Sequence, residues 1–188
     1  MDGKQLQVLE TKEMLKQGLL TLLQSQDFSE ISVTDIIEVS QTSRRTFYRH
    51  FRNKGALLDY YLQELMKEYF RVEEDMLNKP NQYEAYLYLF RFWYNKRQEL
   101  RGLVKSQLFS SFISAWNAHS PAVLQPFFKE QMDMQLFRIH FLIGGYSNAI
   151  WNWLQEEEPE QPEVITDYFF KIVGYFTCDK DDSTSKKE

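Results

Sequence analysis

The chain of 188 residues contains 43% hydrophobic and 16% aromatic residues, few glycines and prolines, and a formal net charge of −5. This composition excludes a disordered chain, and a protein of this overall charge can bind nucleic acid only if its positive charge is concentrated locally. The single cysteine, Cys178, excludes an internal disulfide, and polar residues interrupt both uncharged stretches too often for a membrane span. The N-terminal residues are polar and do not form a signal peptide, so we expect a cytoplasmic protein.

The N-terminal region begins with two predicted helices. Apolar residues recur at helical spacing over residues 11–26, which indicates the first helix. A second, shorter helix is expected to begin near Val33. Its N-cap is either Ser32 or Thr34, because either hydroxyl can accept a hydrogen bond from a free backbone N–H group.

A third short helix is expected over residues 43–50, after a polar break at residues 40–43. Ser43 is its predicted N-cap. Phe47 and Phe51 lie four residues apart, so they share one helix face, which we expect to point inward. The two short helices and the turn between them form a helix-turn-helix pattern.

The rest of the chain also predicts helices, beginning with a long one over residues 54–77 that carries a continuous apolar stripe. We expect a break at Ser120-Pro121, because proline removes a backbone donor, and a disordered charged tail over residues 179–188. Further helices are expected over residues 81–96, 99–105, 106–118, 122–129, 132–156 and 162–177.

Positive charge is concentrated on and beside the third predicted helix. No acidic residue lies between Val39 and Leu58. The basic residues of this segment are Arg44, Arg45, Arg49, Arg52 and Lys54. One interpretation is a solvated surface face. The other is a recognition helix, since an α-helix fits the major groove of DNA and arginine donates two hydrogen bonds to guanine or to phosphate.

The segment from Ile31 to Leu58, ISVTDIIEVSQTSRRTFYRHFRNKGALL, resembles the N-terminal signature of the TetR family of transcription regulators. Its most specific part is TFYRHF, which begins at Thr46. The resemblance extends over about residues 9–60, and the remainder matches only in being helical. It implies an all-α protein with three parts. These are a three-helix DNA-binding domain with a helix-turn-helix over residues 1–53, a helical ligand-binding and dimerisation domain over residues 54–178, and the tail.

The resemblance also implies roles for matching residues. Arg44, Arg45 and Tyr48 are expected to face bases or nearby backbone, and Thr46, His50 and Lys54 to contact phosphates. With Arg49 of the basic segment, the expected DNA-binding residues are Thr34, Arg44, Arg45, Thr46, Tyr48, Arg49, His50 and Lys54. The resemblance also places Thr34 over the DNA backbone or the groove edge, as an expectation, and implies structural roles for Phe47 and Phe51. The sequence departs from the family pattern at Gln41, where glycine is frequent, and at Arg45, where a small residue is frequent. The first departure suggests a slightly different turn.

The C-terminal domain is rich in aromatic residues, which either form an ordinary core or line a cavity for a small aromatic or lipophilic effector. The expected pocket residues are Tyr86, Phe90, Trp93, Phe109, Phe112 and Trp116. The last two helices carry more apolar surface than one small domain needs. In the family they pack against the same two helices of a second subunit as a four-helix bundle. The expected dimer-interface residues are Phe137, Phe141, Gly144, Gly145, Asn148, Trp151, Phe169, Phe170 and Val173.

These features predict a ligand-responsive repressor that binds a near-palindromic operator as a homodimer. The alternatives are an activator of the same family and a helical partner-binding protein that no longer reads DNA.

The three histidines are scattered and no glycine-rich phosphate loop is present. We therefore expect no enzymatic activity, no catalytic residue, no metal and no cofactor. Because the helix over residues 54–77 joins both domains, we expect it to transmit effector binding to the DNA-binding domains and so to change the separation between them.

Overall fold

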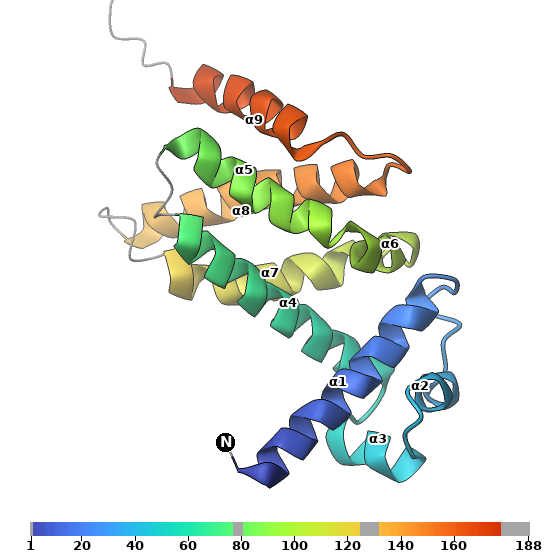
Figure 1. Cartoon of the computed structure of the whole chain (residues 1–188). Helices are drawn as coiled ribbons and strands as arrows, with labels where there is room; N and C mark the ends of the chain where they lie inside the picture. The colour runs from blue at the N-terminus through green and yellow to red at the C-terminus, as the bar shows by residue number, and fades with distance from the viewer. Residues whose placement is uncertain (1, 77–80, 125–131, 178–188) are drawn as a thin grey trace, which may run out of the picture.

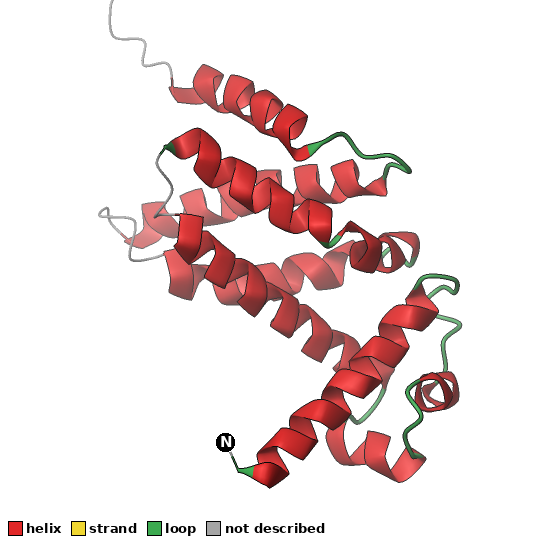
Figure 2. Ribbon diagram, viewed as in Figure 1, coloured by secondary structure: helices red, strands yellow, loops and turns green. Residues whose placement is uncertain are grey.

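The structure is a computed structural model that describes residues 2–76, 81–124 and 132–177. Over these residues the chain forms nine α-helices and no strand, which confirms the predicted all-α class (Figure 2). None of the described helices combines the length and apolar character that a membrane span requires. The predicted tail over residues 179–188 lies outside the described residues.

The first three helices are α1 (Gly3–Leu23), α2 (Val33–Val39) and α3 (Arg44–His50). The predicted positions of α2 and α3 are confirmed. Helix α1 begins eight residues earlier than the predicted start at residue 11, because Asp2 and Gln5 form a capping box that satisfies the free N–H groups of its first turn.

Six helices follow in the rest of the chain. They are α4 (Lys54–Met76), α5 (Gln82–Asn95), α6 (Arg97–Lys105), α7 (Phe109–Leu124), α8 (Met132–Gln155) and α9 (Pro162–Thr177). The predicted break at Ser120-Pro121 is wrong, because α7 continues through Pro121 to Leu124. Proline inside a helix removes one hydrogen bond, and a helix can bend there without ending. The expected helix over residues 122–129 extends into residues 125–131, which lie outside the described part.

Helix α4 connects the two ends of the molecule (Figure 1). At its beginning it packs against α1, and further along it packs against α5 and α7. Helix α9 covers α5, and α8 packs against α6 and α7. Helix α6 contacts α1 as well, so the N-terminal helices are attached to the C-terminal bundle through two helices.

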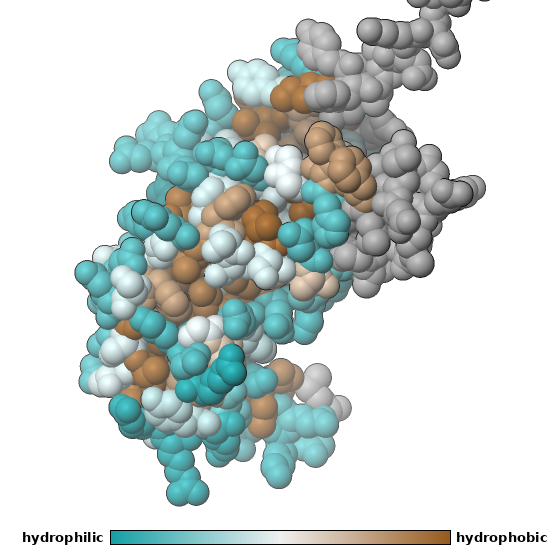
Figure 3. Space-filling model, turned by 180° about the vertical axis from the view of Figure 1, so that it is seen from behind, coloured by the Kyte–Doolittle hydropathy of each residue, from teal (hydrophilic) through white to brown (hydrophobic). Residues whose placement is uncertain are grey.

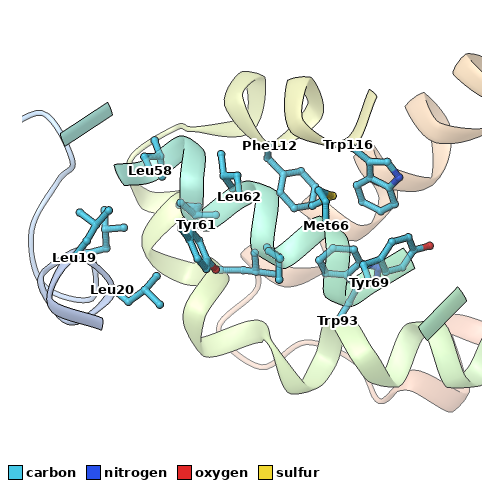
Figure 4. Packing of buried hydrophobic residues seen from close by; sticks show 14 of the residues in the cluster. Leu19, Leu20, Leu58, Tyr61, Leu62, Met66, Tyr69, Trp93, Phe112 and Trp116 are labelled. Atoms are coloured by element: carbon cyan, nitrogen blue, oxygen red, sulfur yellow. The ribbon is translucent and has the colours of Figure 1, made fainter. Parts of the chain in front are cut away.

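The hydrophobic core follows α4 without a break (Figure 4). Near the beginning of the helix, Leu58 and Leu62 belong to the same cluster as Leu19 of α1, and further along Tyr69 meets Trp93 and other rings. Every residue of the predicted apolar stripe is buried. These residues are Leu57, Leu58, Tyr61, Leu62, Leu65, Met66, Tyr69 and Phe70. One continuous core therefore joins the predicted DNA-binding and regulatory parts.

Helices α1 and α2 cross closely at Gly18. A Cβ added there lies 3.0 Å from the Ser40 Cβ and 3.1 Å from the carbonyl oxygen of Ile36. We expect Gly18→Val to lower the free energy of unfolding by about 1–3 kcal/mol, because the added methyl groups force the two helices apart. Urea unfolding followed by circular dichroism measures the change.

Gly3→Val is the matched control, because no atom lies within 4 Å of a Cβ added at Gly3. We expect its unfolding midpoint to remain near that of the wild type. If both variants unfold at the same urea concentration, the close crossing at Gly18 does not limit the side chain at this position.

Candidate nucleic-acid interface

The turn between α2 and α3 is fixed by hydrogen bonds of the backbone. The N–H group of Thr42 donates to the carbonyl of Ile37 at 3.0 Å, and that of Gln41 donates to the carbonyl of Glu38 at 3.2 Å. This arrangement, a Schellman motif, places the residue after the cap in the left-handed region, where glycine is common. Gln41 has a φ of 51°. It thus adopts the conformation typical of glycine at this position, although it carries a side chain.

Caps at the beginning of α2 and α3 set the direction of both helices. Ser32, one of the two predicted candidates, is the N-cap of α2 and forms a capping box with Asp35. The N–H of Ser32 donates to the carboxylate of Asp35 at 2.7 Å, and this hydrogen bond lowers the pKa of Asp35. Ser43 caps α3 as predicted, accepting from the N–H of Thr46 at 3.0 Å.

The inner face of α3 is anchored by its two phenylalanines, as predicted. Phe47 is fully buried and Phe51 is almost so, with ring centroids 6.0 Å apart. Lys12 of α1 supports the same side, since its ammonium lies 5.9 Å from the ring of Phe51 and 4.9 Å from that of Tyr60. With this face fixed, the opposite face of α3 points to solvent.

The outer face of α3 is basic and exposed. The exposed side chains are Arg44, Arg45, Tyr48 and Arg49, followed by Arg52 just after the helix. Among the residues that the structure describes, none of these arginines forms an ion pair. The guanidinium of Arg44 lies 5.5 Å above the ring of Tyr48, a cation–π geometry that orients both side chains. These charges are available to an external anion.

The remaining predicted DNA-binding residues differ in exposure. Thr34 is exposed on the first turn of α2, whereas Thr46 is half-buried with its hydroxyl 2.8 Å from that of Ser43. His50 is also half-buried, and burial lowers the pKa of its ring, with the positive charges of Arg49 and Lys12 acting in the same direction. The lowered pKa favours the uncharged form of the ring.

Lys54 differs most from its expected role as a phosphate contact. Its ammonium donates to the carbonyls of Phe28, Ser29 and Ile31, at 2.7, 2.9 and 2.6 Å. An ammonium has three N–H donors, and all three are directed to the backbone of the loop between α1 and α2. No local pattern predicts this contact, because its partners lie 23 to 26 residues earlier in the chain.

The predicted pocket residues are brought together in two neighbouring groups of packed rings. Trp93, Phe112 and Trp116 are fully buried in mutual contact, with centroid distances between 5.1 and 5.6 Å. Tyr86 and Phe90 both contact Phe169 of α9. Phe109 completes the set from the start of α7. An effector that enters here must displace rings that now fill the space.

The predicted dimer-interface residues fall into an exposed and a buried set. Phe137 and Phe141 of α8 are 70% and 67% exposed, and their rings stack at a centroid distance of 6.5 Å. Exposed with them are Gly144, Gly145 and Asn148.

Trp151 is instead buried in its own subunit, where it contacts Phe109 and Phe112. Phe169 and Phe170 are half-buried against rings of α5. The side chain of Val173 lies outside the described residues.

This geometry defines a helix-turn-helix DNA-binding domain: a capped supporting helix, a fixed turn, and a second helix with a buried aromatic face and an exposed arginine face. Residues 18–61 match the family model described as bacterial regulatory proteins, tetR family. The N-terminal part of the chain is thus similar to the DNA-binding domain of this family, as the sequence resemblance predicted, and the relatives that it matches are described as HTH-type transcriptional regulators.

Two sequence relatives match the N-terminal part. The HTH-type transcriptional regulator YxbF of Bacillus subtilis (strain 168) is 37% identical over 62 residues, which cover 32% of this chain and 16% of YxbF. DhaS of Lactococcus lactis subsp. lactis (strain IL1403), the HTH-type dhaKLM operon transcriptional activator, is 28% identical over 72 residues, or 38% of each chain. The matches thus span well under half of these relatives.

Solved structures extend the likeness in fold to most of the chain. A TetR transcriptional regulator from Streptococcus agalactiae 2603V has a TM-score of 0.63 at 22% identity, covering 90% of this chain and 97% of its own. The dihydroxyacetone kinase operon activator DhaS has a TM-score of 0.58 at 16% identity, with 88% and 95% covered. The TetR family repressor AlkX from Dietzia sp. strain DQ12-45-1b has a TM-score of 0.58 at 17% sequence identity, and the match covers 88% of this chain and 94% of AlkX.

The contacts of Lys54 generate a prediction that separates a structural role from a phosphate contact. We expect Lys54→Met to lower the free energy of unfolding by about 3 kcal/mol, because three carbonyls lose a charged donor. The variant should leave the slope of log Kd against log salt concentration unchanged. Arg49→Ala should reduce that slope by about 1 for each bound subunit, the change expected for one lost phosphate contact per subunit.

Lys67→Met is the control for the stability measurement. Lys67 is exposed and, among the described residues, pairs with Glu64 alone, which lies on the same helix, so we expect a change within about 0.5 kcal/mol. If Lys54→Met keeps the stability of the wild type and its slope of log Kd against log salt concentration is reduced, Lys54 contacts a phosphate instead.

Proposed function

We propose that the chain is a homodimeric repressor that binds a near-palindromic operator through α3 of each subunit and responds to a small aromatic or lipophilic effector. The observation that carries the DNA-binding part of this proposal is the outer face of α3. Its arginines have no ion-pair partner among the described residues, while the opposite face is anchored in the core. A cytoplasmic location follows from the need to reach DNA.

The proposed contacts divide between bases and phosphates. Arg44, Arg45 and Tyr48 project from the first turns of α3 and are assigned to base edges and nearby backbone. The proposed phosphate contacts are Thr34, Thr46, Arg49 and His50. Lys54 is assigned to holding the loop between α1 and α2, since its donors are already engaged.

The proposed dimer interface lies on α8 and α9. Large hydrophobic side chains are exposed on both helices: Phe137, Phe141, Tyr168 and Ile172. Viewed from behind, the molecule carries hydrophobic residues between polar ones, several of them in the upper part of the view, where the C-terminal helices lie (Figure 3). An exposed apolar patch on a globular protein favours self-association, and two-fold symmetry matches a near-palindromic site.

Effector binding is assigned to the packed rings between α4, α5, α7 and α8. The indole N–H of Trp93 is buried and has no hydrogen-bond partner among the described residues. A buried donor without a partner is unfavourable, so an effector with an acceptor atom gains from pairing with it. If effector and operator favour different arrangements of the dimer, each weakens the binding of the other.

Activation is the second candidate for the direction of regulation. DhaS, described as an activator, is similar to this chain in both sequence and structure, while AlkX, described as a repressor, is similar in structure. The position of the operator decides between them: a site overlapping the promoter indicates repression, and a site upstream of it indicates activation.

Selection of genomic DNA tests the operator assignment. We expect the wild-type protein to enrich one or a few near-palindromic sites and Arg45→Ala/Tyr48→Ala to bind them at least about 100-fold more weakly, since each lost base contact is worth about tenfold and the variant loses two of them in each subunit. Lys67→Ala, which removes one exposed positive charge from α4, should bind as the wild type does. If the wild-type dimer retains no site at moderate salt, the chain is instead a helical partner-binding protein.

A second experiment tests the dimer. Phe141→Arg places a charge on the proposed interface twice per dimer, so we expect the dissociation constant of the dimer to rise on the order of 100-fold. Analytical ultracentrifugation measures it. Leu6→Arg, which charges an exposed leucine of α1 instead, should leave the dimer intact. A Phe141→Arg protein that dimerises like the wild type excludes this face of α8.

A further inference from the structure

Helix α6 crosses the C-terminal end of α1 at Gly102. A Cβ added at Gly102 lies 2.6 Å from the Cβ of Leu23 and 2.7 Å from its carbonyl oxygen. These distances are shorter than any side chain tolerates, and one of the atoms is backbone, which cannot rotate away. On either side of the crossing, Leu100 and Leu103 are buried in the core. The two helices therefore approach as closely as glycine alone permits.

The end of α6 makes a second contact with the N-terminal domain. The oxygen of the Ser106 side chain accepts a hydrogen bond from the N–H of Phe28 at 2.8 Å. Ser106 is held in place by the turn that follows, in which the N–H of Leu108 donates to the carbonyl of Leu103 at 2.9 Å and Gln107 has a φ of 54°. This turn is a Schellman motif, which fixes the backbone around Ser106.

The loop that receives Ser106 is also held from α4. Phe28 lies in the loop between α1 and α2, and its carbonyl is one of the three that accept from Lys54. The ammonium of Lys54 lies 4.9 Å from the Phe28 ring as well. One short loop is thus attached to the first residue of α4 and to the residue after α6. Packing against α4 restrains the N-terminal domain along one helix, and the second attachment restrains it at α6 as well.

Helix α6 is in turn fixed to the C-terminal bundle. Lys96, just before α6, forms ion pairs with Glu68 of α4 at 2.9 Å and with Glu99 at 3.4 Å. Arg101 donates to the carbonyl of Glu157, just after α8. The position of α6, and with it the position of Ser106 and Gly102, therefore follows the bundle that carries the proposed dimer interface.

We propose that Ser106 and Gly102 determine the half-site spacing of the operator, by fixing the orientation of the DNA-binding domain on the C-terminal domain. This inference rests on the proposed function, since spacing exists only for two domains bound to one site. Adding one base pair between half-sites moves one of them by about 3.4 Å and rotates it by about a tenth of a turn. A domain restrained along one helix follows that change more easily than a domain that is also attached at a second point.

The test uses the operator that the wild-type protein selects, in duplexes with the spacer kept, shortened or lengthened by one base pair, and a duplex with a single half-site. We expect the wild type to bind either altered spacer at least about tenfold more weakly, because base contacts of one half-site are lost. Ser106→Ala should lose less than about threefold on the same duplexes, with its affinity for the single half-site unchanged. Ser106→Thr keeps the acceptor oxygen and should retain the wild-type preference.

Gly102→Ala tests the second contact by displacing α6. We expect repeated selection with this variant to yield sites whose spacer differs from that of the wild-type operator. Gly3→Ala is the control for a helical glycine, because no atom lies within 4 Å of a Cβ added there, and it should select the wild-type spacing. Thermal unfolding and half-site affinity verify that each variant is folded.

Two outcomes overturn the inference, and they are distinguishable. If Ser106→Ala and Gly102→Ala keep the wild-type spacing preference, these residues do not set it, and the proposed function stands. If the wild-type protein selects no DNA with paired half-sites, the proposed function fails and the inference fails with it. A loss of single half-site affinity in Ser106→Ala also overturns it, because the residue then supports the domain itself.

Discussion

The apolar stripe of α4 is the constraint on which the rest of the structure depends. The helix is 23 residues long and is buried against α1 at its beginning and against α5 and α7 further along. Since protein interiors are close-packed, the helices packed on either side of α4 cannot shift independently of it. The domain boundary between residues 53 and 54 remains a prediction. The hydrophobic core is continuous across it. The two parts are separate in sequence pattern and continuous in packing.

Local patterns predicted the N-terminal region well. Ser43 and the pair Phe47 and Phe51 act within one helical turn, so their spacing alone identifies them, and Ser32 was one of two candidates for the cap of α2. The early start of α1 also had a local signal, Asp2 followed three residues later by Gln5, which the apolar stripe obscured. The loop contacts of Lys54 and Ser106 had no such signal, because they join residues that only the folded chain brings together.

The C-terminal domain was predicted less well, for a different physical reason. A filled aromatic core and an aromatic cavity need the same residue types, so composition cannot distinguish them. Helix α8 is apolar around much of its circumference, and periodicity does not tell which side faces its own subunit. Trp151 points into the core while Phe137 and Phe141 face solvent. The effect of Pro121 likewise depends on the surrounding helices rather than on the residue itself.

The exposed arginines of α3 also give the molecule an asymmetric charge distribution. The segment between Val39 and Leu58 is wholly basic, so the remainder of the chain is more negative than the overall −5. In the field of a polyanion such a body experiences a torque: its acidic part is repelled and its basic helix is drawn forward. Encounters with DNA are thus biased toward the α3-first orientation before any base is contacted. This bias weakens as salt shortens the range of the field, so ionic strength governs how often a collision is productive as well as how long the complex lasts.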